Sequence, residues 1–409
     1  MTQRVYLRTF GCRANQYDSE AVRALVESSG GVIVDSAEEA TVAVFNSCAV
    51  TAAAESELRR SVRHAARVNA SLETVVMGCA AARDTGVITA LPSVAHVIPG
   101  ADMPAIAAAL GVVPKPGSAR VQSGTRALLR IQDGCDEHCT FCATTLARGA
   151  NRSRPISELV SEAAALSQHH PEIVLTGIHI GTYGADTGTT LGALVERLVR
   201  DVPVVRFRLS SLEATEVDAR LLELLNEPSR LAPHLHAPLQ SGSDRVLKRM
   251  GRHWYTSGSY ARAVQRIVEH RHVFALGADV IAGFPGETAA EHRATCALIE
   301  ELPFTYLHVF PYSLRPGTAA ERLPGHIPAG LIRERAAQLR VLADAKRQTY
   351  AGSRAGGLAD VIVVRGDVRE GLTEDYLEVR LDAEPLPRGS RVRARLRLAD
   401  GGLVASPYL

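Results

Sequence analysis

The sequence predicts an α/β protein in three parts: an N-terminal doubly wound parallel sheet, a central partial barrel of six β/α units, and a small C-terminal β-barrel. Short apolar strands alternate with amphipathic helices through residues 1–112 and again through residues 127–345. Such alternation is typical of parallel strands joined by helices. From residue 353 onward, short strands are separated by turns, which is typical of a small β-barrel.

Composition sets broad limits on the chain. Its 409 residues are enough for two or three domains, and a hydrophobic fraction of 46% allows a sizeable core. The formal net charge of +2 gives no overall polybasic character, so local patches would have to meet any nucleic-acid partner. No apolar stretch is long enough to span a membrane and the N-terminus does not read as a signal peptide, so we expect a cytoplasmic protein with no membrane partner.

The first part of the chain contains five strand candidates. They are Arg4–Phe10, Val32–Val34, Ala43–Asn46, Thr74–Met77 and Val94–Ile98. Helical patterns occupy Asn15–Ser29 and Thr51–Asn69. The second of these has a basic face, formed by Arg59, Arg60, Arg63 and Arg67.

Three cysteines follow strands of this first part. Cys12, Cys48 and Cys79 each come directly after a strand candidate. Because ligands of such sheets bind at the carboxyl ends of the strands, we expect the three thiols to point into one crevice. Any one of them alone would more often be an inert core cysteine. Three at equivalent strand ends favour a metal site.

A stretch rich in proline and glycine, residues 111–126, reads as a linker, and the second alternation follows it. The strand candidates are Ala127–Gln132, Glu172–Thr176, Val204–Ser210, His234–Pro238, Ala278–Ala282 and Tyr306–Phe310. The helical patterns between them include Ile156–Ser167, Leu191–Val199 and Ala289–Glu301. Six units are too few for a closed eight-stranded barrel, and they suit the partial barrel that the family resemblance described below implies.

The central part also contains three closely spaced cysteines. Cys135, Cys139 and Cys142 form a C-x3-C-x2-C pattern without a fourth cysteine nearby. A structural zinc site usually takes four protein ligands and opens with a different spacing. An iron–sulfur cubane also normally takes four cysteines. The economical interpretation is a 4Fe–4S cluster with one iron left open for a ligand that is not protein; a zinc or other structural site is the alternative.

The C-terminal part follows a predicted break at Gly352–Gly357. Its strand candidates are Asp360–Val364, Tyr376–Leu381, Ser390–Leu398 and Leu403–Ala405. Arginines alternate along the third of these strands, which puts their side chains on one face. They are Arg391, Arg393, Arg395 and Arg397. Such a face repels itself unless an anion lies across it, and a polyanion such as tRNA is the natural partner.

Two sets of motifs resemble a known family. The C-x3-C-x2-C spacing, with Phe141 before its last cysteine, resembles the radical S-adenosylmethionine superfamily. Thr9–Gln16, Asn46–Thr51 and Gly78–Ala80 resemble the cysteine motifs of the methylthiotransferase N-terminal domain. This resemblance covers essentially the whole chain. It implies two 4Fe–4S clusters, one on Cys135, Cys139 and Cys142 and an auxiliary one on Cys12, Cys48 and Cys79.

The resemblance also implies a division into domains and a chemistry. Residues 1–112 correspond to the methylthiotransferase N-terminal domain, residues 127–345 to the radical SAM core, and residues 353–409 to a TRAM-like RNA-binding domain. The open iron would bind S-adenosylmethionine and cleave it to a 5′-deoxyadenosyl radical. A second S-adenosylmethionine would methylate sulfur at the auxiliary cluster, and the methylthio group would pass to an unactivated carbon.

Several strand ends resemble the cofactor-binding motifs of this family. The residues expected to contact S-adenosylmethionine are Phe141, Thr176, Gly177, Ser211, Glu213 and Gln240. Glu213 suits the ribose hydroxyls, although an ordinary acid at a helix start is an equal alternative. His236, in a segment similar to the family's His-x-Pro-x-Gln-Ser-Gly-Ser, is more often a satisfied core histidine. No side chain is assigned as a general acid or base.

RNA contacts are expected at two places. Arg148, Arg152 and Arg154 follow the cluster loop directly, and the alternating arginines of the terminal barrel form the second place. Arginine suits contacts with phosphate and with unstacked bases. A solvated surface is the alternative for each.

The substrate expected from the resemblance is N6-threonylcarbamoyladenosine at position 37, beside the tRNA anticodon, methylthiolated at C2. Isopentenyl-adenosine tRNA and an aspartate of a ribosomal protein are the alternatives within the family. Arg13 and Ala14 stand where the favoured branch usually has lysine and valine. A non-catalytic iron–sulfur RNA-binding protein is the alternative of another class. The expected partners are the tRNA anticodon stem-loop, a reductase or flavodoxin or ferredoxin as electron donor, and a sulfur donor.

Overall fold

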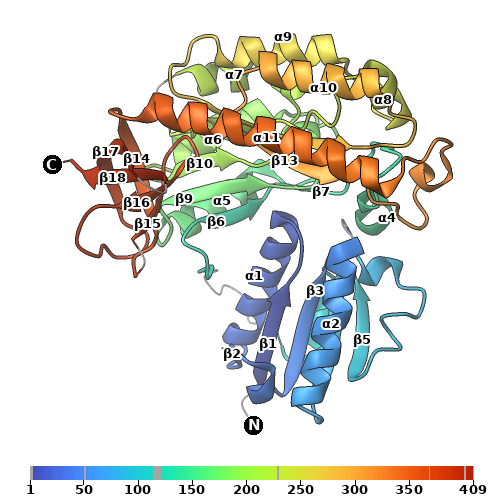
Figure 1. The fold of residues 1–409 in the computed structure, drawn as a ribbon. Coiled ribbons are helices and arrows are strands. Elements are labelled where there is room, and N and C mark those ends of the chain that lie inside the picture. The colour runs from blue at the N-terminus through green and yellow to red at the C-terminus, as the bar shows by residue number, and fades with distance from the viewer. Residues whose placement is uncertain are drawn as a thin grey trace.

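The computed structural model describes residues 3–49, 52–113, 121–227, 230–367, 369–399 and 402–408. Residues 114–120 of the expected linker lie outside these ranges. The chain forms three units, and the N-terminal sheet unit lies against one side of the central unit (Figure 1). The C-terminal barrel lies at one end of the central unit.

The N-terminal unit is a five-stranded parallel sheet with helices on both faces. Its strands are β1 (Arg4–Thr9), β2 (Val32–Val34), β3 (Val42–Ser47), β4 (Glu73–Gly78) and β5 (Val94–Pro99), in the order β2-β1-β3-β4-β5. Its helices are α1 (Arg13–Ser28), α2 (Ala52–Val68) and α3 (Met103–Ala109). Phe45 and Leu58 belong to the apolar core on one face, and Val44 and Ile106 to the core on the other. The predicted doubly wound sheet is confirmed.

The central unit is an open barrel of six parallel strands. These are β6 (Ala127–Arg130), β9 (Glu172–Thr176), β10 (Arg206–Leu209), β11 (His234–His236), β12 (Ala275–Ala282) and β13 (Tyr306–Pro311). They form two three-stranded sheets, β10-β9-β6 and β11-β12-β13. Single bridges, Phe207 to Leu231 and Ser211 to His236, join the two sheets. The predicted partial barrel is therefore confirmed.

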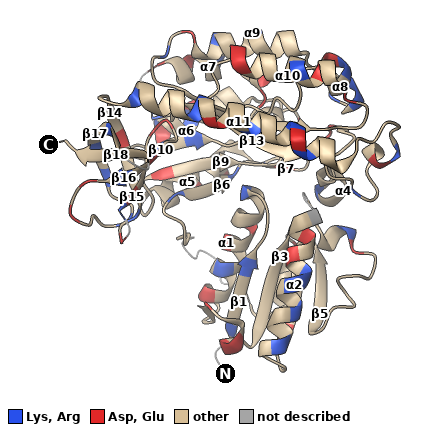
Figure 2. Cartoon of the chain, in the orientation of Figure 1, with Lys and Arg blue, Asp and Glu red and all other residues tan. Residues whose placement is uncertain are grey.

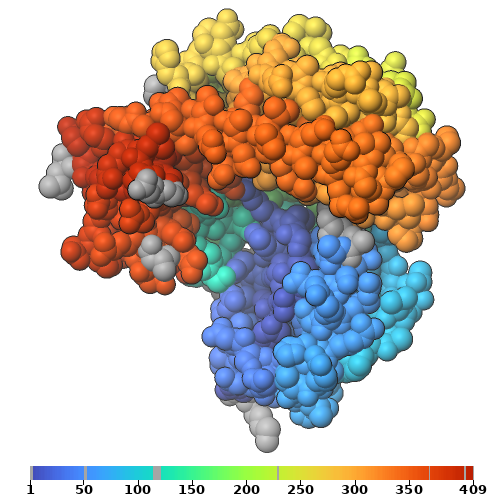
Figure 3. Space-filling view, viewed as in Figure 1, coloured from blue at the N-terminus to red at the C-terminus, as the bar shows by residue number. Residues whose placement is uncertain are grey.

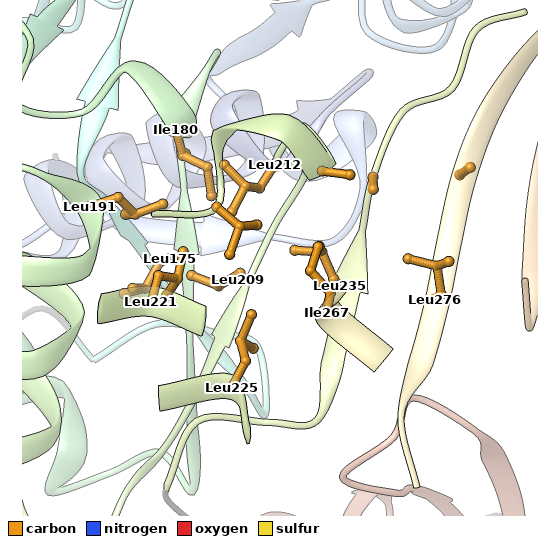
Figure 4. Packing of buried hydrophobic residues seen from close by; sticks show 14 of the residues in the cluster. Leu175, Ile180, Leu191, Leu209, Leu212, Leu221, Leu225, Leu235, Ile267 and Leu276 are labelled. Atoms are coloured by element: carbon orange, nitrogen blue, oxygen red, sulfur yellow. The ribbon is translucent and has the colours of Figure 1, made fainter. Parts of the chain in front are cut away.

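Helices surround this barrel. They are α4 (Thr144–Arg148), α5 (Ile156–Ser167), α6 (Leu191–Asp201), α7 (Ala219–Asn226), α8 (Asp244–Arg249), α9 (Ser257–Val268), α10 (Ala289–Glu301) and α11 (Ala329–Arg354). Figure 4 shows Leu175 and Leu209 of the strands packed among helix side chains such as Leu221 and Leu225. Because strand residues alternate between faces, the intervening positions, Glu172 among them, face the inside of the barrel.

The strand expected over Ala127–Gln132 is two strands. After β6 the chain turns away at Ile131, whose amide donates to the Thr176 carbonyl at 2.9 Å. The short strand β7 (Gln132–Asp133) then pairs in antiparallel fashion with β8 (Arg152–Ser153). This change of partner begins the loop that carries the central cysteines.

The C-terminal unit is a closed five-stranded barrel, which confirms the predicted small β-barrel. Its strands are β14 (Leu358–Arg365), β15 (Glu370–Leu372), β16 (Glu378–Leu381), β17 (Arg391–Ala399) and β18 (Gly402–Pro407). The expected break began too early, because α11 continues through Gly352 to Arg354. Helix α11 and strand β15 had not been predicted.

The three units meet at Tyr376, in the turn before β16. Its hydroxyl accepts a hydrogen bond from Arg13 of α1 at 2.9 Å, and its ring lies 4.5 Å from that of His234 in β11. A cavity of about 400 Å³ is lined by residues of all three units, including Arg13, Arg126 and Val364. Figure 3 shows the surface hollowed between the N-terminal unit and the C-terminal barrel. The contacts of Tyr376 therefore form a junction between all three units.

A buried ion cluster lies at the base of the central barrel. Both carboxylate oxygens of Glu172 accept hydrogen bonds, from Arg206 at 2.6 Å and from Arg208 at 2.9 Å. Arg126 adds a third guanidinium at 3.3 Å. Burial alone would raise the pKa of Glu172, but Arg208 and Arg206 outweigh it and hold that pKa well below its usual range. The charge of Glu172 therefore compensates Arg206 and Arg208, which have almost no access to water.

We predict that Glu172→Gln destabilises the protein by about 3–5 kcal/mol, because it leaves buried guanidinium groups without a counter-ion. Urea unfolding followed by circular dichroism measures this change. The control is Glu196→Gln, whose carboxylate pairs with Arg220 at the surface. Its loss should stay below about 1 kcal/mol. Equal, small effects of both substitutions would contradict the prediction.

Candidate active site between two cysteine triads

The three N-terminal cysteines converge at the carboxyl edge of the sheet. The Sγ atoms of Cys12 and Cys79 lie 3.9 Å and 3.8 Å from the same atom, Asn15 Oδ1. A Cβ atom on Gly11 would lie 2.5 Å from the Sγ of Cys48, and Gly11 has a φ of +98°. Glycine at this position lets the loop of Cys12 close over Cys48. The expected crevice is present.

Asn15, in the first turn of α1, organises these loops. Its side-chain nitrogen donates to the carbonyls of Phe10 at 2.9 Å and Ser47 at 2.8 Å. These residues lie just before Gly11 and Cys48. The buried amide therefore fixes two cysteine loops relative to each other and points its oxygen at two sulfurs. Asn15 lies within the Thr9–Gln16 motif, but the sequence alone does not reveal this role.

The central cysteines lie on the loop between β7 and α4. The Cys135 amide donates to the Gly149 carbonyl at 3.0 Å, and the Cys142 amide donates to the Cys139 carbonyl at 3.0 Å. Gly134 has a φ of +74°, and a Cβ atom there would lie 1.8 Å from the Ala150 carbonyl oxygen. The loop is therefore closed on itself by backbone contacts that exclude a side chain at Gly134.

Hydrogen-bond donors surround the sulfurs of this loop. Arg252 donates to the Sγ of Cys139 at 3.4 Å, and the Thr144 amide donates to that of Cys142 at 3.3 Å. His179 Nδ1 lies 3.6 Å from the Sγ of Cys135. Burial raises the pKa of the Cys139 thiol to about 12, with Arg252 opposing this effect. Since metals bind thiolates, donors placed at the sulfurs fit a ligated state.

Both triads fit the clusters that the motifs imply. Each offers three thiols that form no disulfide. The seventh cysteine, Cys296 on α10, lies apart from both sets, with its Sγ 3.6 Å from His292. Each set thus leaves a cluster one position for a ligand that is not cysteine. The role of the six cysteines as ligands remains a prediction.

The two triads face each other across the contact between the units. Ala143, directly after Cys142, packs with Ala49 and Cys79 in one apolar cluster. Arg148 at the end of α4 donates to the Sγ of Cys79 at 3.4 Å, to Asn15 Oδ1 at 2.8 Å and to Asp18 at 2.7 Å. One arginine of the central cluster loop therefore holds the opposite triad.

This position corrects the role expected for Arg148. Only 3% of its side chain is exposed, and its guanidinium is occupied by Asp18, Asn15 and Cys79, so it is not available to RNA. Arg152 is 61% exposed. Arg154 pairs with Glu162 at 2.7 Å. Of the three arginines, Arg152 alone presents a largely solvated side chain.

The strand-end residues expected to hold S-adenosylmethionine are divided between buried and exposed positions. Thr176 is buried, and a Cβ atom on Gly177 would lie 2.8 Å from the Gln132 carbonyl, so the backbone there is tightly packed. Ser211 is exposed. Gln240 is buried with a φ of +61°. Phe141 lies edge-on to Phe284 at 6.3 Å.

Glu213 is buried and occupied by the protein. Its carboxylate accepts hydrogen bonds from Arg252 and from the indole of Trp254. Arg252 also contacts the Sγ of Cys139 and donates to the Tyr255 hydroxyl at 2.9 Å. Glu213 is therefore connected through Arg252 to the central triad. The sequence alone did not indicate Arg252 as part of the site.

Two further polar clusters lie inside the barrel, and their pairings were not predicted. His179, after β9, pairs with Glu216 at 2.8 Å and lies beside Cys135. Asp279 of β12 accepts from His236 at 3.0 Å and from His308 at 3.1 Å. Burial opposes ionisation, yet these hydrogen bonds hold the pKa of Asp279 below its usual range. His236 is a satisfied buried histidine.

The arginines of β17 are exposed on one face, as the alternation predicted. Two of them already have acidic partners. Arg391 donates to Asp360 at 2.8 Å, and Arg397 donates to Asp382 at 3.0 Å. Arg395 donates to the Gly356 carbonyl at 2.8 Å and lies over the Tyr408 ring. The expected self-repulsion of this face is therefore largely relieved within the barrel.

The chain is similar to known proteins over most of its length. Residues 4–100 match the model of the uncharacterized protein family UPF0004, and residues 129–299 match the radical SAM superfamily. A threonylcarbamoyladenosine tRNA methylthiotransferase MtaB from Rickettsia prowazekii is 34% identical over 91% of this chain and 90% of its own length. The same enzyme from Thermotoga maritima is 34% identical with the same coverage. The chain belongs to the radical SAM methylthiotransferase family.

Other relatives within the family are named for a different nucleoside. A tRNA-2-methylthio-N(6)-dimethylallyladenosine synthase from Thiobacillus denitrificans is 32% identical to this methylthiotransferase over 91% of the chain and 89% of its own length. Among solved structures, a radical S-adenosylmethionine methyltransferase, TsrM, from Kitasatospora setae has a TM-score of 0.58 at 16% identity, covering 78% of this chain and 77% of its own. That likeness supports the fold.

Within the described residues, no helix is both long and apolar enough to cross a membrane.

We predict that Cys48→Ala lowers the iron bound per reconstituted chain by about half, because one of two clusters of equal size loses a ligand. Iron and sulfide analysis after anaerobic reconstitution measures this loss. Cys296→Ala is the matched control and should keep the wild-type content. Unchanged iron in Cys48→Ala would show that Cys12, Cys48 and Cys79 do not bind a cluster.

Proposed function

We propose that this methylthiotransferase adds a methylthio group to C2 of N6-threonylcarbamoyladenosine at position 37 of tRNA. The observation that carries the proposal is the placement of the two cysteine triads, which face each other across one contact bridged by Arg148. Methylthio transfer needs a hydrogen-abstracting centre and a sulfur source close together. The names of relatives at 34% identity favour the threonylcarbamoyl substrate.

The protein supplies positions for the groups that do the hard chemistry. When bound, a cluster on Cys135, Cys139 and Cys142 together with S-adenosylmethionine would supply hydrogen abstraction, and a cluster on Cys12, Cys48 and Cys79 would supply the sulfur. Arg252 joins Cys139 to the buried Glu213, which holds this side of the site in place. Thr176, Gly177, Gln240, Phe141 and Ser211 are the proposed cofactor-binding positions.

The interface of the units limits where a substrate can enter. Arg148 and the apolar cluster of Ala49, Cys79 and Ala143 occupy one part of the contact between the units. Arg315 of the central unit donates to the Ala49 carbonyl at 2.6 Å on the same side. A flipped nucleotide therefore has to enter from a side that these contacts leave open. Arg152 and the exposed arginines of β17 are proposed RNA contacts.

The reaction also needs an electron donor, such as a flavodoxin, a ferredoxin or a reductase, and a sulfur donor. We propose both as partners, and the cytoplasm, where tRNA is modified, as the location. A second substrate is favoured by a specific observation, since the dimethylallyladenosine synthase is 32% identical over nearly the whole chain. The experiment has to separate the two nucleosides.

We predict that reconstituted protein, given dithionite, S-adenosylmethionine and unmethylthiolated tRNA, yields a threonylcarbamoyladenosine heavier by one SCH2 unit. Nucleoside mass spectrometry after digestion of the tRNA detects it. Cys48→Ala is the control and should still cleave S-adenosylmethionine without forming the product.

A methylthio group found only on dimethylallyladenosine would assign the other substrate. Cleavage of S-adenosylmethionine without any modified nucleoside, by protein shown to contain both clusters, would refute tRNA methylthiolation.

A further inference from the structure

Helix α2 carries an exposed basic face that the proposed chemistry does not use. Arg60, Arg63 and Arg67 are exposed, and their spacing of three and four residues puts them on one side of the helix. The opposite side, with Leu58 and Val62, is buried in the sheet core. Figure 2 shows basic residues, in blue, at several positions along α2. The helix therefore presents a row of cations to solvent.

Several other surface arginines of the chain have acidic partners. Arg197 pairs with Asp201, Arg220 with Glu196 and Glu223, and Arg347 with Asp344. Among the described residues, none of the arginines of α2 forms an ion pair. Like charges three or four residues apart on a helix repel each other. Binding of an anion from outside the chain would relieve this repulsion.

The helix that carries the row begins next to the reaction centre. Helix α2 follows the loop of Cys48 and Ala49, which contacts the central unit through Arg315. With a rise of 1.5 Å per residue, Arg60 lies about 12 Å and Arg67 about 22 Å along the helix from its start. Several consecutive phosphates of an RNA strand span this distance. A strand that leaves the centre along α2 would meet the three guanidinium groups in turn.

We propose that the arginine face of α2, formed by Arg60, Arg63 and Arg67, binds the sugar–phosphate backbone of the substrate RNA next to the modified nucleotide. The proposal rests on the proposed function, because it takes tRNA as the substrate. Arginine suits the task, since its planar guanidinium can bind a phosphate through two hydrogen bonds.

The composition of the face favours RNA over an acidic protein. Its other exposed residues include Ala53, Ser56, Glu57 and His64, which are small or polar, and Glu57 is already paired with Arg8 of β1 at 2.9 Å. A protein partner usually needs an apolar or aromatic centre to its interface. Backbone binding of nucleic acid needs charge alone. The arginines of β17 are less suited to the same role, because Asp360 and Asp382 already neutralise two of them.

The test compares two triple variants that remove the same charge. The first is Arg60→Gln with Arg63→Gln and Arg67→Gln. The control is Arg197→Gln with Arg220→Gln and Arg347→Gln, all at arginines that are paired on the surface. Binding of tRNA is measured by filter binding between 50 and 200 mM salt, on protein with both clusters. Iron content and cleavage of S-adenosylmethionine without tRNA should match wild type in both.

The α2 variant should bind tRNA at least tenfold more weakly at low salt. Its slope of log affinity against log salt should fall by roughly 2, because each lost phosphate contact removes about 0.7–0.9. The control should keep the wild-type slope. With modification assayed, KM for tRNA should rise while kcat changes little.

Three results would overturn the proposal. Wild-type affinity and slope in the α2 variant would show that the face does not touch RNA. Wild-type tRNA binding with slower reduction by an acidic flavodoxin would assign the face to a protein partner instead. Failure of the unsubstituted protein to bind tRNA would refute the proposed function itself, and the α2 proposal with it.

Discussion

The buried guanidinium of Arg148 connects the two halves of the reaction site. It belongs to the helix that follows the central cysteine loop, and it pairs with Asp133 of β7 at 3.5 Å. Its hydrogen-bond partners, however, lie in the N-terminal unit: Asp18, Asn15 and the sulfur of Cys79. Asp18 also pairs with Arg130 of β6 at 2.5 Å, which adds a second link between the units. A buried cation is stable only with its partners in place. The site therefore takes its shape only when the two units dock.

The two triads are built in different ways. The central cysteines are close in sequence and lie on one loop, so their geometry is local. Cys12, Cys48 and Cys79 come from three strands, and the parallel sheet brings them together because its strands end at the same edge. Asn15 fixes two of those loops and also receives a hydrogen bond from Arg148. The distant triad is thereby coupled to the local one.

The parts of the site that depend on local pattern could be predicted from the sequence. The strand ends at Cys12, Cys48 and Cys79 follow from apolar strands and the rules of parallel sheets. The partners of Arg148 could not be predicted, because Asp18 lies 130 residues away and no periodicity connects them. The same holds for Glu213, whose carboxylate is occupied by Arg252 and Trp254. Helix α11 was missed in part because Gly352 near its end reads as a break.

The proximity of the triads can be measured by electron paramagnetic resonance of the dithionite-reduced protein. Two reduced clusters that face each other across Cys79 and Ala143 should couple magnetically. The spectrum of the unsubstituted protein is then expected to be broader than the sum of the spectra of Cys48→Ala and Cys135→Ala, each of which keeps one cluster. A spectrum equal to that sum would show two clusters too far apart to act on one nucleotide, contrary to the arrangement described.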